Sequence, residues 1–400
     1  MTAPTPRPAR FAALDGMRAL ACYAVMATHV GFETGQAFGN GAAAPWLARL
    51  DASVPIFLAL SGFLLYRPFV QAAMTAGPAP RVLDFYWRRA VRVLPAYWLA
   101  IAGTLGVLSA RRANGGDWLA YLTLTQNYNS HDVDPSLTHM WTLVVEVSFY
   151  AVLPVLAISL ARRAWRPDRM LRTQCALIGA LIVGSIAWQA TAFHVAALGP
   201  VAVNWLPGTI DWFAIGMFLA VLSCVPPQCV AMPRLRATLH QWAQYPGMCW
   251  LMALVLYWFV TLPIGGPLDL QTPTAWQHVT KHVMEGLLVF FMMLPLTLAS
   301  GGAIGRALGN RVSRFFGEIS YGVYLWHLPM LLLIQRSLDL PVFRGHYPEY
   351  FLLTAGSATV LGAASWYWLE RPLLRRFSRP WRRSTAEPVT MRHSAARHSA

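Results

Sequence analysis

Long apolar runs separated by short, arginine-rich polar connections dominate the chain. A helix needs about 20 largely apolar residues to cross a bilayer core of about 30 Å. Runs of this length recur along almost the whole sequence, and a short run at 118–127 is expected to be a re-entrant or interfacial piece. We therefore predict ten membrane-spanning helices, at residues 11–31, 51–70, 90–109, 141–160, 174–195, 205–224, 247–264, 281–300, 318–336 and 348–370.

The composition agrees with this pattern. Of the 400 residues, 56% are hydrophobic and only 12% are charged, against about 25% charged in ordinary soluble proteins. The predicted fold is an all-α, polytopic integral membrane protein. Residues 1–375 are expected to form one transmembrane domain. The polar, basic segment 376–400 is expected to be a disordered cytoplasmic tail.

The arginines indicate how the chain is oriented. Although the formal net charge is +15, the cations lie between apolar runs, which argues against a nucleic-acid-binding protein. Short loops rich in arginine stay in the cytoplasm, so we expect both termini there. The opposite connections carry fewer cations and more acids: Arg49, Arg111, Arg112, Lys281 and Arg344, with Glu33, Asp51, Asp117, Asp132, Asp134 and Asp269.

The five cysteines show no spacing typical of a metal site. We therefore expect neither a bound metal nor a disulfide, because the nearest pair, Cys224 and Cys229, falls in a connection assigned to the reducing cytoplasm.

The first predicted helix contains ionisable residues, which inside a membrane span indicate a functional site by default. Arg18 and His29 are eleven residues apart, so they point to within about 20° of one direction with a rise of about 16 Å. Asp15, three residues before Arg18, can pair with it. The alternative is an arginine that reaches the interface and a histidine that bonds a neighbouring helix.

A second group of cations opens the third helix, in FYWRRAVRVLPAYW. Arg89 and Arg92 share a helix face. Because the guanidinium fork suits phosphate, this pair indicates a site for a phosphorylated ligand such as a nucleotide-bearing coenzyme. Ordinary positive charge at the cytoplasmic membrane boundary is the alternative.

Polar residues also recur inside two later helices. Glu146 lies a few residues inside the helix that follows His139, and a carboxylate near the outer face can orient a histidine or accept a proton. In GEISYGVYLWHLP, Ser320, Tyr324 and His327 share one face. They either line a pore or bond between helices.

Taken in order, these segments resemble the membrane acyltransferase family 3, which O-acylates surface polysaccharides, peptidoglycan and related acceptors. Val147 departs from the pattern, because the family usually has an acidic or polar residue there. Larger members add an extracytoplasmic esterase-like domain, so we expect this chain to complete the transfer itself or to hand the acyl group to a separate extracytoplasmic transferase protein. The resemblance rests on LDGMRALACYAVMATHV, SGFLL (61–65), FYWRRAVRVLPAYW, THMWTLVVEVSFY, GEISYGVYLWH and WYWLERPL.

The resemblance implies roles for these residues. Acyl-CoA, most simply acetyl-CoA, would be the donor substrate, with its phosphates at Arg18, Arg89 and Arg92, and no cofactor would be bound permanently. His29 would act as general base or take the acyl group covalently, and Glu146 would orient it or relay protons. The residues expected to support the site are Asp15, Ser61, Trp141, Tyr324 and His327.

The acceptor is expected to be a hydroxyl of an extracytoplasmic glycan, reached from the bacterial inner membrane. A secreted small molecule such as a macrolide sugar is the alternative acceptor. A secondary transporter is the rival class of protein, but the two halves of the sequence show no internal repeat. A membrane scaffold would have little reason to bury Arg18, His29 and Glu146 together.

Overall fold

The computed structural model describes residues 11–39, 41–75, 77–108, 113–128, 134–161, 166–192, 194, 201–268, 271–339 and 342–377. Within these ranges the chain is helical and contains no strand, which confirms the all-α prediction. The predicted tail, apart from its first two residues, lies outside the described residues. The longer elements are α1 (Ala12–Glu33), α2 (Ala44–Ala48), α3 (Val54–Met74), α4 (Val82–Gly103), α5 (Gly115–Leu122), α6 (Trp141–Ala161), α7 (Pro167–Ala192), α8 (Leu206–Ser223), α9 (Pro233–Ala243), α10 (Pro246–Thr261), α11 (Ala275–Leu298), α12 (Gly302–Leu308), α13 (Arg311–Ser337), α14 (Tyr347–Ala364) and α15 (Arg371–Phe377).

Short helical segments join or extend these helices. Two of them are π-helical: η3 (Thr104–Leu108), which continues α4, and η8 (Ser365–Glu370), which joins α14 to α15. The others are 3-10 turns: η1 (Gln36–Phe38), η2 (Leu50–Ser53), η4 (Pro135–Met140), η6 (Ala202–Asn204) and η7 (Pro263–Gly265).

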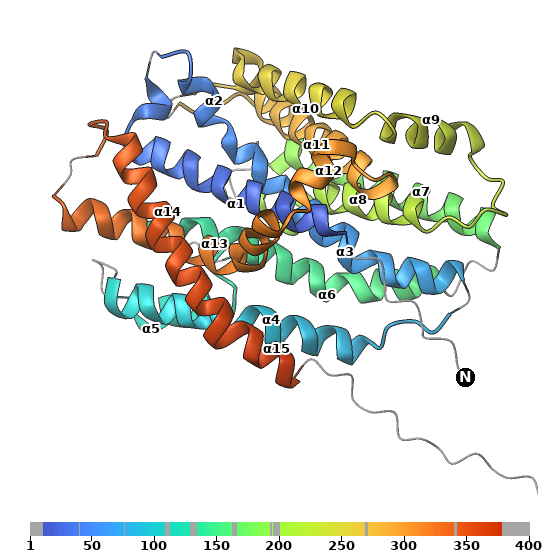
Figure 1. Ribbon diagram of the computed structural model, residues 1–400, viewed down its shortest axis with the longest axis horizontal. Helices are drawn as coiled ribbons and strands as arrows, with labels where there is room; N and C mark the ends of the chain where they lie inside the picture. The colour runs from blue at the N-terminus through green and yellow to red at the C-terminus, as the bar shows by residue number, and fades with distance from the viewer. Residues whose placement is uncertain are drawn as a thin grey trace, which may run out of the picture.

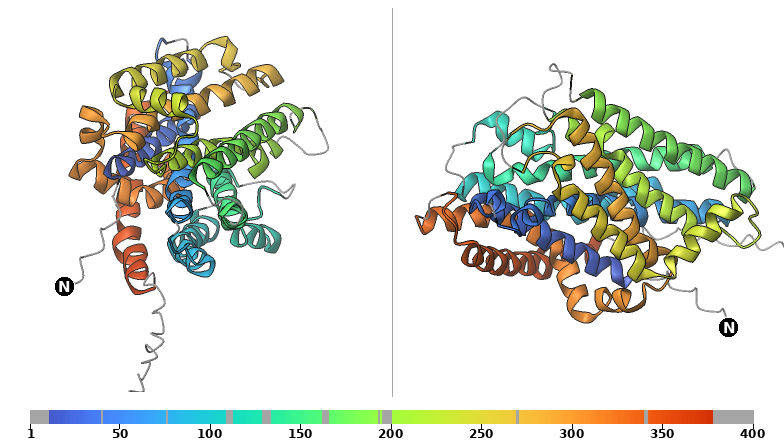
Figure 2. Two further views of the ribbon diagram at one scale, coloured as in Figure 1. Left: turned by 90° about the vertical axis from the view of Figure 1, so that its right-hand side faces the viewer. Right: turned by 90° about the horizontal axis from the view of Figure 1, so that it is seen from above.

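Most of the long helices lie side by side along the longest dimension of the molecule (Figure 1), and the second pair of views shows them gathered into one bundle (Figure 2). This arrangement is that of a multi-pass membrane protein. In the described part of the chain, six stretches are long and apolar enough to cross a bilayer: Leu50–Met74, Val82–Leu108, Pro135–Ser159, Pro167–Ala192, Ala202–Ser223 and Ala275–Leu298. A seventh crossing results if α9 and α10, which meet at a 92° bend, form one span.

The remaining predicted spans are helices that are too short or too polar to count as membrane-crossing by length and composition alone. They are 11–31, 318–336 and 348–370, which correspond to α1, α13 and α14 with η8. The three helices pack on one another, α1 on α13 and α13 on α14. Charged and polar residues make these three helices less apolar than the other spans.

The helix that contains the arginine pair begins earlier than its apolar run. We predicted a span from residue 90, whereas α4 starts at Val82. The prediction followed hydrophobicity, which Arg88, Arg89 and Arg92 interrupt. These arginines therefore lie inside a continuous helix, and Arg89 and Arg92 line a cavity within the bundle.

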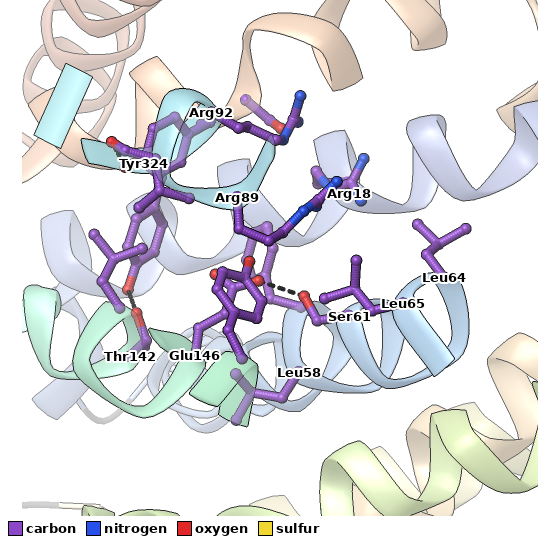
Figure 3. A pocket seen from close by; sticks show the side chains of 16 residues that line it. Arg18, Leu58, Ser61, Leu64, Leu65, Arg89, Arg92, Thr142, Glu146 and Tyr324 are labelled. Carbon is purple, nitrogen blue, oxygen red and sulfur yellow. Dashed lines mark hydrogen bonds between the residues drawn. The ribbon is translucent and has the colours of Figure 1, made fainter. Parts of the chain in front are cut away.

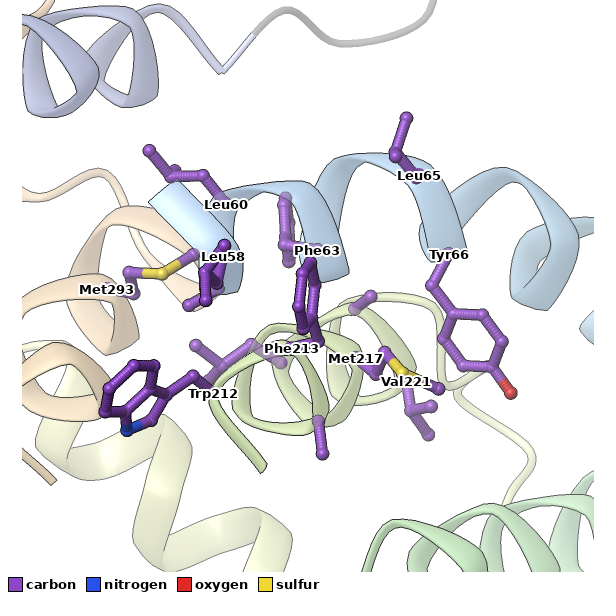
Figure 4. Close-up of a cluster of buried hydrophobic side chains, with 14 of the residues drawn as sticks. Leu58, Leu60, Phe63, Leu65, Tyr66, Trp212, Phe213, Met217, Val221 and Met293 are labelled. Carbon is purple, nitrogen blue, oxygen red and sulfur yellow. The ribbon is translucent and has the colours of Figure 1, made fainter. Parts of the chain in front are cut away.

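The centre of the bundle is a close crossing of α3 and α8, the pair of helices that packs most extensively. A Cβ atom on Gly62 would lie 2.1 Å from the carbonyl oxygen of Phe213, and one on Gly216 would lie 1.9 Å from that of Ala59. Small residues let membrane helices approach in this way. Figure 4 shows the apolar layer around the crossing, in which the fully buried Phe63 and Phe213 meet.

We expect Gly216→Ala to destabilise the bundle, because its Cβ would collide with rigid backbone of α3. Overpacking of this kind costs about 1 to 3 kcal/mol, so the purified variant should lose its monodisperse form at a clearly lower temperature in detergent. Gly179→Ala in α7 is the matched control, since a Cβ there meets no atom within 4 Å. Equal melting of the two variants would contradict the close crossing.

Candidate functional site

A cavity of about 100 Å³ lies inside the bundle between α1, α3, α4, α6 and α13. Its lining combines residues that are far apart in the sequence, as Figure 3 shows. The lining contains six of the site residues that the sequence predicted: Arg18, Ser61, Arg89, Arg92, Glu146 and Tyr324.

Positive charge dominates the cavity. Arg18 comes from α1, and Arg89 and Arg92 come from α4, so three guanidinium groups face one lining carboxylate, that of Glu146. Arg92 repels Arg18, while Asp15 attracts it with 3.5 Å between Oδ1 and the Nη1 atom of Arg18. The paired side chains of Arg18 and Asp15 keep about one fifth of their surface exposed. Clustered cations in a low-dielectric setting form a strong anion site.

Glu146 is fixed from two helices. The Ser61 hydroxyl on α3 donates a hydrogen bond to its Oε1 atom, and Tyr150, one turn further along α6, interacts with both Glu146 and Arg89. Glu146 therefore faces the arginines. No contact joins it to His29 among the described residues, so the structure places it on the arginine side of the site and not beside the histidine.

Tyr324 forms the boundary of this cavity. Its hydroxyl donates to the backbone carbonyl of His139 at 2.8 Å and bonds the Thr142 hydroxyl at 2.8 Å. Its ring contacts Phe57 on the cavity side, with 5.6 Å between centroids. On the other side the ring contacts His139 and His327, at 5.3 and 5.4 Å.

Beyond Tyr324 three histidines from different elements meet. The ring of His29 lies 5.2 Å from that of His327 and 6.4 Å from that of His139, and those two rings are 4.7 Å apart. The Nδ1 atom of His327 donates to the carbonyl of Tyr324 at 2.7 Å. Its Nε2 atom, and both ring nitrogens of His139, are buried with no partner in the described part of the chain. Imidazoles in this state can accept or donate a proton.

A metal site is not formed by these groups. Among the described residues, no set of three or more histidine, cysteine, aspartate and glutamate side chains has the geometry to hold a metal ion. The five cysteines are all free thiols.

Among the site residues predicted from the sequence, Trp141 lies apart from both the arginine cavity and the histidine group. Its side chain is partly buried and packs against the apolar core, and its backbone carbonyl accepts a hydrogen bond from the Asn127 side chain at 3.0 Å. This bond links the start of α6 to the turn after α5. Trp141 therefore supports the position of Thr142 and Glu146 without lining the cavity.

The sequence interpretation missed a second buried polar cluster. We expected Lys281 and Asp51 to be charges in outer connections, yet Lys281 lies in the second turn of α11 and binds Asp51 Oδ2 at 2.6 Å and Glu285 Oε1 at 3.3 Å. The adjacent His282 binds Asp211 at 2.8 Å. The missed signal was HVTKHVME, in which polar residues recur at helical spacing.

Comparisons with known proteins agree with the motifs. A family model for an acyltransferase domain matches residues 11–369. The exopolysaccharide production protein ExoZ of Rhizobium meliloti (strain 1021) is 28% identical over 360 residues, covering 88% of this chain and 95% of that protein. No solved structure matches.

Two further relatives are longer. The putative peptidoglycan O-acetyltransferase YrhL of Bacillus subtilis (strain 168) is 25% identical, and the match covers 92% of this chain and 56% of the relative. The peptidoglycan O-acetyltransferase OatA of Listeria monocytogenes is 22% identical, with coverage of 90% and 55%. The chain thus spans about half the length of these two proteins. Since the family model matches nearly the whole chain, the protein belongs to the membrane acyltransferase family 3 and is an O-acyltransferase.

Proposed function

We propose that this acyltransferase moves an acetyl group from acetyl-CoA at the cytoplasmic face to a hydroxyl of an extracytoplasmic glycan. The observation that carries the proposal is the convergence of Arg18, Arg89 and Arg92 on one cavity, separated by a single tyrosine from a group of histidines. An anion site and a proton-accepting group on one path suit a donor with several phosphates and a reaction that removes a proton from a hydroxyl.

The donor half of the site is the arginine cavity. The three guanidinium groups would hold the phosphates of CoA, and Glu146, which accepts a hydrogen bond from Ser61, offsets part of their mutual repulsion. The cavity is far too small to enclose a whole coenzyme. The nucleotide would therefore remain at its cytoplasmic mouth while the pantetheine arm points toward Tyr324.

The reacting half is the histidine group. His29 would remove the proton of the acceptor hydroxyl or take the acyl group covalently. Because Tyr324 lies between the cavity and His29, the thioester has to pass this side chain. His327 and His139 would then surround the reacting atoms as further polar groups.

The ends of the described chain support a topology of ten spans with both termini in the cytoplasm. The guanidinium of Arg67, near the end of α3, lies 5.1 Å from the ring centre of Phe11. The indole of Trp87, near the start of α4, donates to the carbonyl of Phe377 at 2.9 Å. Since α3 and α4 are joined by a short connection, Phe11 and Phe377 lie at the same end of the bundle, which requires an even number of crossings.

Glycan is proposed as the acceptor because of the relatives. ExoZ is named for exopolysaccharide production, and YrhL and OatA are named as peptidoglycan O-acetyltransferases. All of these names point to polysaccharide hydroxyls outside the cytoplasm. The bacterial inner membrane is the location where such an enzyme meets both substrates.

The donor site can be tested by binding alone. We expect CoA to raise the melting temperature of the purified protein, and Arg89→Gln to weaken CoA binding about tenfold or more, since a charge-assisted hydrogen bond contributes about 1.5 to 3 kcal/mol. Arg67→Gln is the control, because Arg67 bonds Ser223 outside the cavity lining. Equal binding by both variants would argue against the arginine cavity as the donor site.

The reaction can be tested in membranes from a host that expresses the protein. We expect radiolabel from acetyl-CoA to appear on host glycan, and His29→Ala to reduce the transfer at least about a hundredfold, as expected for loss of a general base or nucleophile. His240→Ala, at an exposed position of α9, should transfer at the wild-type rate. Undiminished transfer by the His29 variant would exclude His29 as the reacting group.

A further inference from the structure

An open groove of about 640 Å³ lies at the end of the bundle where α1 stops. It is several times larger than the arginine cavity, and its volume falls within the range of about 300 to 1,000 Å³ that is typical of ligand sites. Its walls come from two connections, the one that follows α1 around η1 and the one that joins α10 to α11 through η7. The distribution of arginines assigns both connections to the extracytoplasmic side.

The lining of this groove is polar but uncharged. Among the described residues that form it there is no aspartate, glutamate, lysine or arginine, in contrast to the arginine cavity. Gln271 and Thr272 are exposed, and Phe38 adds a partly exposed aromatic ring. Amide and hydroxyl groups bond the hydroxyls of a sugar, and an aromatic ring packs against its C–H face. The lining therefore suits a neutral carbohydrate better than a charged ligand.

A buried arginine holds one wall of the groove in place. The guanidinium of Arg49 donates to the backbone carbonyl of Val260 and to the three carbonyls of residues 265–267, at 2.7 to 3.2 Å. The Gln277 side chain donates to the carbonyl of Pro263 at 2.9 Å, which ties η7 to α11. A wall fixed in this way is ready for a ligand, because less freedom is lost on binding.

The groove approaches the histidine group through two aromatic rings. Phe32 lies one turn after His29 on the same face of α1, and its ring centre is 5.1 Å from that of Phe38. A helical turn spans about 5 Å, so the edge of the groove at Phe38 lies close to the turn that carries His29. His29 is partly exposed, whereas His139 and His327 are only 3% and 0% exposed.

We propose that this groove binds the acceptor glycan and presents one of its hydroxyls to His29. The inference rests on the proposed function and deepens it by placing the acceptor, which is a neutral, hydroxyl-rich stretch of sugar. The acetyl donor approaches the histidines from the side of Tyr324, and the acceptor approaches them from the side of Phe38. The groove and the arginine cavity share no lining residue, so donor and acceptor bind independently.

Filling the groove tests the proposal. We expect Thr272→Trp and Gly39→Trp, one in each connection, to reduce acetyl transfer to host glycan at least about tenfold, because the indole occupies the space that the acceptor needs. CoA should still raise the melting temperature of both variants as it does for the wild type. Gly41→Trp is the matched control, since Gly41 is exposed, lies outside the lining and has room for a Cβ. Wild-type transfer by the variants at Thr272 and Gly39 would overturn the proposal.

A binding measurement separates the groove from the proposed function. Thr272→Cys is placed in lipid nanodiscs, which contain no sugar-headed detergent, and its labelling by a hydrophilic maleimide is quantified by mass spectrometry of the peptide. We expect cellotetraose or its N-acetylated counterpart, chitotetraose, to slow this labelling about threefold at a concentration of about twice its Kd. Labelling of Gly41→Cys should be unaffected by either sugar.

The outcomes of the two experiments are distinct. If the wild type transfers no acetyl group, the proposed function fails, while protection of Thr272→Cys by a tetrasaccharide still supports a carbohydrate site in the groove. Labelling of Thr272→Cys that neither sugar slows would overturn the proposal, whatever the transfer assay shows.

Discussion

Bilayer hydrocarbon offers no water to a charged side chain, so every ion inside this bundle has to face another helix or a polar cavity. That constraint accounts for two groups of charges that lie within the bundle. Arg18, Arg89 and Arg92 converge on Glu146, and Lys281 joins Asp51 and Glu285. The close crossing of α3 and α8, made by Gly62 and Gly216, fixes the helix that carries Ser61 against the rest of this framework.

The arginine cavity and the histidine group suit two different parts of the proposed transfer. The arginine cavity is suited to phosphates, whereas the histidine group beyond Tyr324 is suited to moving a proton. In the proposed reaction the donor binds at the first of these sites and the acceptor loses its proton at the second, so the two sites need different chemistry along one path.

Much of the arginine site could be predicted from sequence because helical spacing alone places Arg89 and Arg92 on one face, and Asp15 beside Arg18. The helical fold followed from the length of the apolar runs. Spacing could not reveal which helices are neighbours, so the separation of Glu146 from His29 was not foreseen. Lys281 and Asp51 were taken for loop charges because each borders an apolar run, and only the folded structure shows that Lys281 binds Asp51 and the buried Glu285.

Tyr324 has a further consequence for a cell that maintains a proton gradient. A continuous polar path from the arginine cavity to the histidine group would be a route for ions through the bundle. The tyrosine hydroxyl, bonded to Thr142 and to the backbone of His139, interrupts that path with a side chain held at two points. In the proposed reaction, a thioester that enters from the arginine cavity therefore reaches the histidines only if it displaces this side chain.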